Sequence, residues 1–523
     1  MKDLFEHNIH THFSKELPAD PVMDNRSRQV FNACFSFVKP LQPSNPSLVH
    51  SSKNFTDELG VSIKDEAKLV QVMSGAAAFN GFESYAMCYG GHQFGNWAGQ
   101  LGDGRAINIA EVDLKDGINW KFQLKGAGPT PYSRNSDGLA VLRSSVREYL
   151  CSEAMHHLGV PTTRALSLVK TGDLVRRDIM YDGNPENEQG AIVCRVSPSF
   201  IRFGNFEIFA SRQDKENLQK LVDYTIKHHY PHLGEARDKS TYLKFFEDVA
   251  DRTLEMIVHW QRVGFVHGVM NTDNMSILGL TIDYGPYGWL EDYDPLWTPN
   301  TTDAQGKRYR FGHQPDIALW NLVQLANALY PLIEEVEPLQ TILEKFRTNF
   351  QANYHKMMCG KLGLFSEENV PKEFIQNVEN LLEQWEIDMT IFFREFSKNI
   401  TDFDMLWEGI LKSSYLDIKK LETGRKDWAV WFDSFSNYLA QEKISMDERI
   451  IKMKALNPKY VLRNYMAQLA IDDAENNDYN LLDELYQLLS KPYEEQSGME
   501  KWYAKRPDWA KHKVGCSMLS CSS

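Results

Sequence analysis

Two polar residues that follow short apolar segments give the clearest indication of chemistry in this chain. The segment His267-Gly-Val-Met-Asn-Thr-Asp-Asn274 ends in a polar pair, and Asp283-Tyr-Gly285 begins nine residues after Asn274. Carboxylate and amide oxygens suit Mg²⁺, which leaves its remaining positions to phosphate and water oxygens. We therefore predict that Asn274 and Asp283 hold a divalent metal ion against the phosphates of a nucleotide.

Protein kinases use the same two ligand types, as the catalytic-loop Asn and the Asp of Asp-Phe-Gly. Aligned on the kinase pattern His-Arg-Asp-x-x-x-x-Asn, this chain keeps His267 and Asn274 but has Val269 in place of the catalytic aspartate. Because valine cannot accept a proton, we assign the role of proton acceptor to Asp273. His267 is interpreted as a structural residue of the loop, and His92 is interpreted in the same way.

A glycine-rich segment, Gly-Gln-Leu-Gly-Asp-Gly-Arg at residues 99–105, precedes a predicted strand. Glycines allow backbone N–H groups to approach phosphates without a clash at Cβ, although many such loops are simple turns. A neighbouring guanidinium favours phosphate binding over a simple turn. Gly102, Gly104 and Arg105 are therefore predicted to contact the nucleotide.

Lys125 ends a second predicted strand, and Glu148 lies in the helix that follows. A strand lysine held by a helix glutamate is the kinase arrangement for presenting an ammonium group to phosphates. The alternative is an edge-strand lysine and an unrelated surface glutamate. The two glycines at positions 126 and 128, directly after the lysine, favour a backbone that leaves room for a ligand.

Four more residues are candidate nucleotide contacts. Asp137 and Gly138 are predicted to open a long helix, whose N-terminal N–H groups would attract an anion, although a capped turn is an equal alternative. Arg195 and Arg202 flank Ser-Pro at 197–198 and could bind a phosphate bidentately. The apolar surroundings of Arg195 predict a buried partner, which favours this role over a surface position.

The elements that position these residues follow from hydrophobic periodicity. We predict strands at 106–112, 120–125 and 192–196, a helix at 139–158 with Ser136 or Asp137 as its cap, and a hairpin made of 275–278 and 281–284. Helical patterns dominate from about residue 215, and amphipathic helices fill most of 330–495. This order predicts an α+β, protein-kinase-like fold with a strand-rich N-lobe, a helical C-lobe and additional C-terminal helices.

Composition limits the class of protein. The chain has 523 residues, 42% of them hydrophobic, and a formal net charge of −14, which disfavours a nucleic-acid partner. No apolar segment approaches the roughly 18 residues that cross a membrane, and the N-terminus lacks a signal pattern, so a cytoplasmic protein is expected. The predicted domains are 1–80, an extension packing on the N-lobe, 81–210, the N-lobe, 211–330, the C-lobe, and 331–523, a helical region with a Cys-containing tail.

Several long segments resemble the selenoprotein O family, also called SelO or YdiU, most densely between about 80 and 320. They are Tyr89-Gly-Gly-His-Gln-Phe-Gly-Asn-Trp-Ala-Gly-Gln-Leu-Gly-Asp-Gly-Arg105, Leu124-Lys-Gly-Ala-Gly-Pro-Thr-Pro-Tyr-Ser-Arg134, Val141-Leu-Arg-Ser-Ser-Val-Arg-Glu148, Ile201-Arg-Phe-Gly204, residues 267–285, and Ser520-Cys-Ser-Ser523. The chain is thereby identified as a member of this family, of the type that has cysteine in the tail.

The resemblance implies a pseudokinase fold that binds ATP in the reverse orientation and transfers AMP to Ser, Thr or Tyr hydroxyls of proteins, with release of pyrophosphate. It also implies Mg²⁺ or Mn²⁺, and UMP transfer in some members. By the family's motifs, Asp273 matches the catalytic base and Asn274 and Asp283 match the metal ligands. The matching nucleotide contacts are Gly102, Gly104, Arg105, Lys125, Glu148, Asp137, Gly138, Arg195, Arg202 and Asp283.

Two departures from the family pattern stand out. Relatives usually have Arg at the position of Leu139, and leucine cannot bind phosphate. Where some bacterial relatives are thought to pair the tail Cys with a Cys after the Asp-Tyr-Gly loop, this chain has Pro299. Cys516 and Cys521 are therefore expected to be free thiols in a reducing cytosol, with a disulfide between them as the alternative.

Three functions are compatible with these residues. We favour a protein adenylyltransferase whose partners are protein hydroxyls, the chain's own included, with neither nucleic acid nor membrane as a partner. An ordinary ATP phosphotransferase is the first alternative, and Val269 counts against it. An inactive nucleotide-binding scaffold is the second, and the presence of Asp273, Asn274 and Asp283 counts against it.

Overall fold

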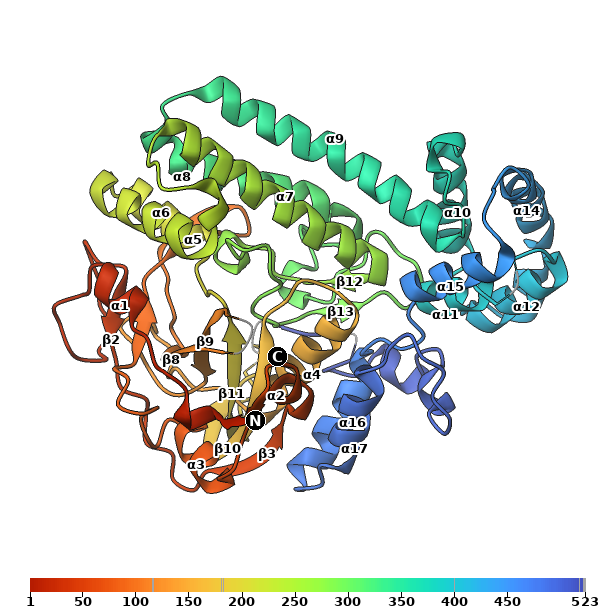
Figure 1. Cartoon of the computed structure of the whole chain (residues 1–523). Helices are drawn as coiled ribbons and strands as arrows, with labels where there is room; N and C mark the ends of the chain where they lie inside the picture. The colour runs from red at the N-terminus through yellow and green to blue at the C-terminus, as the bar shows by residue number, and fades with distance from the viewer. Residues whose placement is uncertain (115–116, 180, 182, 399, 517, 521–523) are drawn as a thin grey trace.

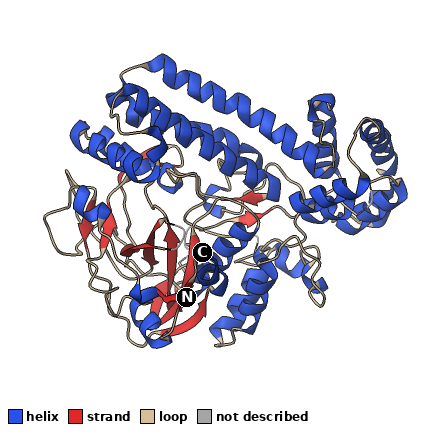
Figure 2. Cartoon of the chain, viewed as in Figure 1, coloured by secondary structure: helices blue, strands red, loops and turns tan. Residues whose placement is uncertain are grey.

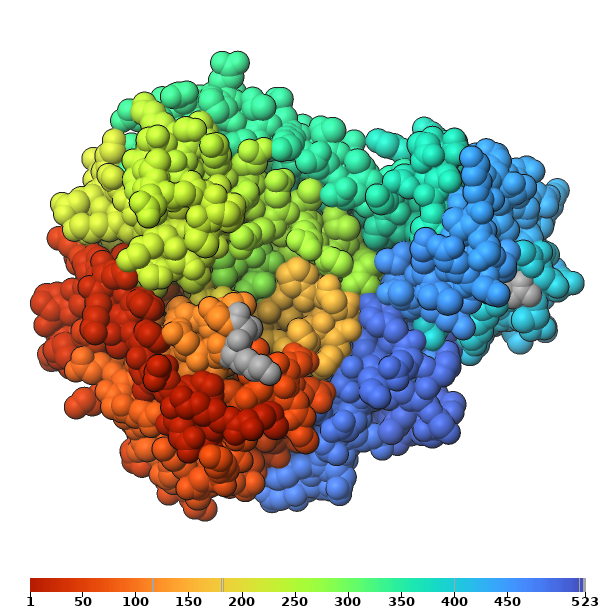
Figure 3. Space-filling view, in the orientation of Figure 1, coloured from red at the N-terminus to blue at the C-terminus, as the bar shows by residue number. Residues whose placement is uncertain are grey.

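The computed structural model of the chain describes residues 1–114, 117–179, 181, 183–398, 400–516 and 518–520. Strands gather in the N-terminal part, and helices make up most of the chain from residue 203 onward (Figure 2). The predicted α+β class is therefore confirmed. In the space-filling view, the helices between about 370 and 455 project at one end of the molecule (Figure 3).

A seven-stranded antiparallel sheet forms the centre of the N-terminal part (Figure 1). Its strands, in spatial order, are β2 (Phe35–Phe37), β5 (Tyr85–Met87), β8 (Ala106–Asp113), β9 (Asn119–Lys125), β11 (Glu186–Ser197), β10 (Arg164–Arg177) and β3 (Ser47–Ser51). The strands predicted at 106–112, 120–125 and 192–196 are thus confirmed as parts of β8, β9 and β11. Both edge strands, β2 and β3, come from the first 80 residues.

The remaining elements surround this sheet. The short strands are β1 (Lys2–Asp3), β4 (Val61–Ser62), β6 (Gly90–Gln93), β7 (Asn96–Gln100), β12 (Phe265–Val266) and β13 (Gly288–Trp289). The helices are α1 (His12–Glu16), α2 (Lys53–Glu58), α3 (Glu66–Met73), α4 (Leu142–His157), α5 (Phe203–Ser211), α6 (Lys215–His229), α7 (Lys239–Val263), α8 (Gln314–Ile333), α9 (Val336–Lys361), α10 (Lys372–Gln384), α11 (Met389–Phe396), α12 (Phe403–Ser413), α13 (Ile418–Glu422), α14 (Arg425–Leu439), α15 (Met446–Leu456), α16 (Asn464–Glu475) and α17 (Asn480–Leu489).

The two faces of the sheet differ in chemistry. On one face, Phe122 and Leu124 of β9 join the apolar core that also contains residues of α2 and α3. The alternation predicted for this strand places Lys121, Gln123 and Lys125 on the other face, where all three are buried. Buried polar groups need partners, so β9 contributes ion pairs and hydrogen bonds to this face, beside apolar residues of the neighbouring strands, such as Leu168 and Val193, that pack with α4.

Helix α4 covers that polar face and connects it to the end of the chain. Val146, Tyr149 and Leu150 of α4 share a core cluster with residues of α16 and α17, and both C-terminal helices lie beside α4 (Figure 1). A separate apolar cluster holds α10 to α14 together. Within the described residues, none of the helices is both long and apolar enough to span a bilayer.

The start of α4 differs from the prediction. The helix begins at Leu142 rather than at 139, and neither Ser136 nor Asp137 caps it, because Val141 occupies the N-cap position and makes no side-chain cap bond. The carboxylate of Asp137 instead accepts a hydrogen bond from the N–H of Leu139 at 3.0 Å, within a turn that precedes the helix. Leu139 forms an isolated β-bridge with Ala127. The helix therefore starts after this bridge, at Leu142.

The hairpin predicted at 275–278 and 281–284 is wrong. The N–H of Ile277 donates to the carbonyl of Ile201 at 3.0 Å, and the N–H of Thr281 donates to the carbonyl of Pro161 at 2.8 Å. Because these neighbours satisfy the backbone groups that the hairpin would have used, the two segments do not pair with each other. The turn predicted at Gly279-Leu280 is displaced as well, because the N–H of Gly279 donates to the carbonyl of Ser276 at 3.1 Å and so closes a turn over 276–279.

Candidate functional site

A cavity of about 700 Å³ lies beside the polar face of the sheet. Its size is within the range of pockets that hold small molecules. The predicted residues that line it are Gly102, Gly104, Arg105, Lys125, Asp137, Arg195, Arg202, Asp273, Asn274 and Asp283. Glu148 and Gly138 are not among the residues that line it. Residues as far apart in the sequence as Gly102 and Asp283 therefore meet in one place.

The lysine and glutamate of the predicted pair are in contact. Lys125 ends β9, opposite Val193 of β11, and its Nζ lies 2.5 Å from Oε2 of Glu148 on α4. Lys125 Nζ is also 3.8 Å from Oδ1 of Asp283. Burial lowers the pKa of Lys125, and the carboxylate of Glu148 opposes that effect. An ammonium group is thus held at the edge of the cavity, as in the kinase arrangement.

Two buried arginines neutralise Asp283. Arg195 of β11 and Arg202, the N-cap residue of α5, each donate to one carboxylate oxygen of Asp283. Arg195 also lies 3.3 Å from Glu148. Burial opposes ionisation of Asp283, but the charges of Arg202, Arg195 and Lys125 outweigh it and hold its pKa well below the ordinary value. The carboxylate is therefore ionised and surrounded by cations.

Asp273 has a different environment only a short distance away. Arg202 donates to its backbone carbonyl at 2.8 Å, and Gln93 Nε2 donates to its Oδ2 at 3.2 Å. Oδ1 is buried and accepts no hydrogen bond from the described residues. Burial raises the pKa of Asp273 to about 6. A carboxylate with one uncommitted oxygen and a pKa just below neutrality has the properties of a general base.

A hydrogen bond to the backbone fixes the orientation of the Asn274 amide group. It ends the short 3₁₀ turn Thr272–Asn274, and its Nδ2 donates to the carbonyl of Val269 at 2.9 Å. Since the amide nitrogen is committed, Oδ1 is the atom that can bind a cation. An amide oxygen and the ionised carboxylate of Asp283 on the same cavity wall form a donor set that fits Mg²⁺ or Mn²⁺.

His267 contributes to the shape of this loop. Its Nε2 donates to the carbonyl of Ile282 at 2.9 Å, and its Nδ1 accepts from the N–H of Val269 at 3.3 Å. The ring also stacks on Trp260, with centroids 5.4 Å apart. Both ring nitrogens are therefore occupied by backbone groups, one of which precedes Asp283 directly.

The glycine-rich loop is constrained by packing as well as by the cavity. Gly102 has φ +119°, and a Cβ there would lie 2.5 Å from the ring of Tyr132. A Cβ on Gly104 would lie 2.9 Å from the carbonyl oxygen of Tyr132. Glycine is thus required for the approach of Tyr132, in addition to any contact with a ligand. Arg105 follows directly and lines the cavity.

The predicted helix N-terminus at Asp137 and Gly138 is wrong, because α4 begins only at Leu142. A Cβ on Gly138 would lie 2.3 Å from the carbonyl carbon of Gly128, so this glycine permits a close crossing of two loops. Asp137 is paired with Arg177 of β10 at 2.7 Å. Arg177 also donates to the carbonyl of Leu139 at 3.1 Å and lines the cavity.

Sequence reasoning gave no role to the β6–β7 hairpin, which lies against the loop that carries Asp273. The N–H of His92 donates to Thr272 Oγ1 at 2.7 Å, and the N–H of Phe94 donates to Asn271 Oδ1 at 3.1 Å. The Gly-Gly-His-Gln-Phe sequence at 90–94 belongs to the Tyr89–Arg105 segment that resembles the family, but nothing in it indicates a partner 180 residues away. Gln93 and Arg177 line the cavity and are not among the residues predicted for the site.

The free thiol of Cys516 is buried. The alternative of a disulfide to Cys521 lies outside the described residues. In the described tail, the N–H of Leu519 donates to the carbonyl of Pro299 at 3.1 Å, so the C-terminal segment packs against the chain that follows Asp283-Tyr-Gly285.

Comparisons with known proteins show which family the chain belongs to. Residues 21–490 match the family described as "Protein adenylyltransferase SelO". The chain belongs to this family. It is 57% identical to the "Protein nucleotidyltransferase YdiU" of Flavobacterium johnsoniae, with 100% of both chains covered, and 54% identical to that of Rhodopirellula baltica, with 99% of this chain and 100% of the relative covered.

A third relative, the protein of the same description from Azoarcus sp., is 52% identical over 98% of both chains. Among solved structures, a match is ROP2 from Toxoplasma gondii, described as a virulence factor with a protein-kinase fold and no enzymatic activity. It is 12% identical, with a TM-score of 0.25, and the match covers 63% of this chain and 96% of that one. The family assignment rests on the sequence relatives, which place the chain among protein nucleotidyltransferases.

Proposed function

We propose that the protein transfers AMP from ATP to Ser, Thr or Tyr hydroxyls of proteins and releases pyrophosphate. The observation that carries this proposal is the placement of the proton acceptor. Val269 stands at the position of the kinase catalytic aspartate, whereas Asp273, with a pKa of about 6, lines the cavity beside Asn274 and Asp283. Membership of the family also supports nucleotidyl transfer to protein.

The cations of the site support a nucleotide that enters with its terminal phosphates deepest. Lys125, Arg195 and Arg202 are buried and come from β9, β11 and the start of α5. Bidentate guanidinium groups bind phosphate oxygens well. If these cations hold the β- and γ-phosphates, the α-phosphorus lies nearer the mouth, where an acceptor hydroxyl and Asp273 can reach it.

We further propose that Arg177 supplies a guanidinium that Leu139 cannot. Its side chain reaches the Asp137–Leu139 turn from the neighbouring strand β10 and lines the cavity. The guanidinium of Arg177, which belongs to β10, would replace the positive charge that is missing at position 139. To bind a phosphate it would have to break its ion pair with Asp137.

The reaction follows from these placements. The carboxylate of Asp273 accepts the proton of the protein hydroxyl while the hydroxyl oxygen forms a bond to the α-phosphorus. The bond between the α-phosphorus and the bridging oxygen of the β-phosphate breaks, and pyrophosphate leaves with that electron pair. Lys125, Arg195 and Arg202 stabilise the charge that develops on the leaving phosphates. Gln93 donates a hydrogen bond to Asp273 Oδ2 and so orients the carboxylate.

Asn274 Oδ1 and the carboxylate of Asp283 would hold the divalent ion, Mg²⁺ or Mn²⁺. When bound, such an ion neutralises phosphate charge and aligns the reacting groups. Asp283 is suited to this because its pKa is held well below the ordinary value. The arginines that contact it in this structure can then turn from the carboxylate to the phosphates.

Intact-mass analysis tests the proposal. The purified chain is incubated with ATP or UTP and with Mg²⁺ or Mn²⁺, together with a hydroxyl-rich acceptor protein, and the Asp283→Asn and Asp273→Asn variants are treated in parallel. A metal-dependent gain of AMP units on either protein, lost in both variants, supports the proposal. If UMP units are gained from UTP and no AMP units are gained from ATP, the substrate is UTP, and the reaction is still nucleotidyl transfer to protein. A phosphate-sized gain establishes an ordinary kinase, and nucleotide binding without any gain favours the inactive scaffold.

A further inference from the structure

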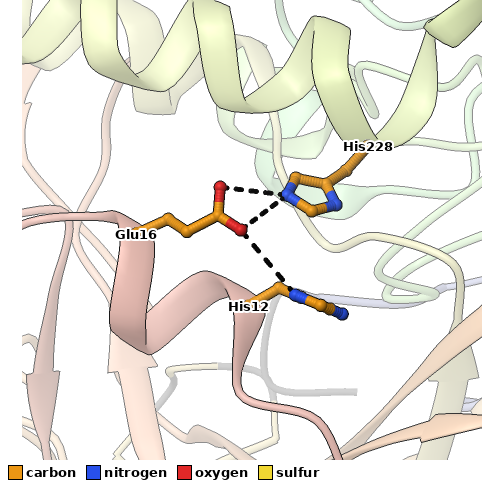
Figure 4. Close-up of side chains that lie close together, drawn as sticks. All are labelled: His12, Glu16 and His228. Carbon is orange, nitrogen blue, oxygen red and sulfur yellow. Dashed lines mark hydrogen bonds and ion pairs between the residues drawn. The ribbon is translucent and has the colours of Figure 1, made fainter.

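Three side chains with metal-binding atoms lie close together at a place that is not part of the cavity lining. His12 and Glu16 belong to α1, and His228 belongs to α6 (Figure 4). His228 Nε2 lies 3.1 Å from both carboxylate oxygens of Glu16, and His12 Nδ1 lies 3.7 Å from Glu16 Oε1. One donor atom from each residue lies within 4.8 Å of the other two.

The backbone holds these residues at fixed positions. His12 and Glu16 are four residues apart and so share one side of α1. Phe13, between them, packs edge-on against Tyr224 of α6, with ring centroids 5.5 Å apart. The N–H of His12 donates to Glu111 Oε2 at 3.0 Å, which ties α1 to strand β8. The convergence therefore follows from core packing and does not depend on the three side chains alone.

The donor set and its spacing fit a transition metal. Two imidazoles and one carboxylate are ligands that Zn²⁺ accepts, with bonds of about 2.0–2.2 Å. Tetrahedral geometry then separates the ligand atoms by about 3.3–3.5 Å, and the observed separations of 3.1 and 3.7 Å bracket that value.

Two neighbouring side chains contact the cluster, one of them cationic. Lys227 Nζ is 2.9 Å from Glu16 Oε2, but its side chain is 58% exposed and can move away or stay on that one oxygen. The ring of His10 stacks on His12 with centroids 5.0 Å apart and supports its orientation.

A second cluster provides a contrast. Glu58, His156 and His157 also bring three donor atoms within 4.8 Å of one another. There, however, Arg164 lies 2.7 Å from Glu58 Oε2, and its side chain is only 6% exposed. This buried guanidinium occupies the position that a cation would take, and Glu153 also holds it at 2.9 Å. The second cluster therefore serves as a matched control.

We propose that His12, Glu16 and His228 form a zinc-type site with a water molecule as the fourth ligand. The ion would fasten the N-terminal segment, which runs along β8, to helix α6. These two parts of the chain are 212 residues apart in sequence, and the N-terminal residues and the helices after residue 203 lie against each other at this side of the molecule (Figure 3). The role is structural and separate from the divalent ion of the cavity.

The test uses the untagged full-length chain, stripped with a chelator and titrated with Zn²⁺ and with Co²⁺ in the presence of excess Mg²⁺. We expect about one equivalent of Zn²⁺ to bind and to raise the melting temperature, and Co²⁺ to show the intense visible bands of tetrahedral coordination. The His12→Gln and His228→Gln variants should each bind about 100-fold more weakly, because removal of a ligand costs at least as much as removal of its supporting groups.

Three comparisons make the outcome decisive. The His156→Gln control should bind zinc like the parent, and the Asp283→Asn variant should retain the equivalent because the cavity ion is not involved. Equal melting temperatures of all variants in chelator show that each is folded. Binding that survives in both His12→Gln and His228→Gln, or the lack of any zinc uptake at roughly tens of micromolar, overturns the proposal.

Discussion

The contact between Gln93 and Asp273 leads to a prediction that is specific in both sign and pH range. Gln93 Nε2 donates to Asp273 Oδ2 at 3.2 Å and so favours the ionised carboxylate. We consider the substitution Gln93→Leu, which keeps a similar volume and removes the donor. The pKa of Asp273, about 6 in the intact chain, should rise.

The size of the effect follows from the strength of this hydrogen bond. A hydrogen bond to a charged group contributes about 1.5–3 kcal/mol, and even the lower value raises the pKa by about one unit. The ionised fraction of Asp273 at pH 6 then falls from about one half to about one tenth, whereas at pH 8 it stays near nine tenths. Since a general base works in its ionised form, the transfer rate should fall about fivefold at pH 6 and by less than about 1.2-fold at pH 8.

The assay measures single-turnover incorporation of labelled AMP between pH 5.5 and 8.5. The ratio of variant to parent is taken at each pH, so that effects of pH on ATP and on the metal cancel. Asn96→Leu, an exposed position on the same hairpin, is the matched control and should follow the parent. A uniform loss at every pH would show that Gln93 acts through the shape of the loop, and an unchanged profile would remove it from the site.

Three further outcomes follow from the site. Asp273→Asn should lower transfer by about 10²–10⁴-fold while ATP affinity, measured by calorimetry, changes little; turnover near the parent level would refute the assignment of the base. Lys125→Ala should weaken ATP binding about tenfold or more through loss of one charge-assisted contact, and unchanged affinity would exclude it from the phosphates. Arg177→Leu should weaken ATP binding several-fold, whereas Asp137→Asn, which frees Arg177, should not; equal effects of the two would mean that only their ion pair matters.

Part of this protein could be predicted from short stretches of sequence. The strands β8 and β9 are predicted from alternation of side chains and β11 from a short apolar run, because these patterns depend only on neighbouring residues. The pairing of Lys125 with Glu148 was predicted because the lysine ends a strand and the glutamate lies in the next helix, and the structure places them 2.5 Å apart. The roles assigned to Asp273, Asn274 and Asp283 came from their chemistry and spacing, and they stay predictions until the variants are measured.

The two wrong predictions share one cause. The start of α4 and the hairpin after Asn274 were predicted from local turn and helix signals, but backbone groups at Leu139, Ile277 and Thr281 bond to distant partners instead. A backbone N–H donates to whichever carbonyl oxygen the fold brings close, and that partner depends on contacts across the whole chain.

The sequence by itself therefore determined which chemical groups are available and the local periodicity that carries them. Only the tertiary structure decided that Arg195 and Arg202 share Asp283, that Gln93 reaches Asp273 across 180 residues, and that His12 and His228 meet. The physical reason is that ionisation and hydrogen bonding in a buried site depend on distances of a few ångströms between groups from different elements. Those distances are set by the packing of the sheet, α4 and α5, which no short segment of the sequence specifies.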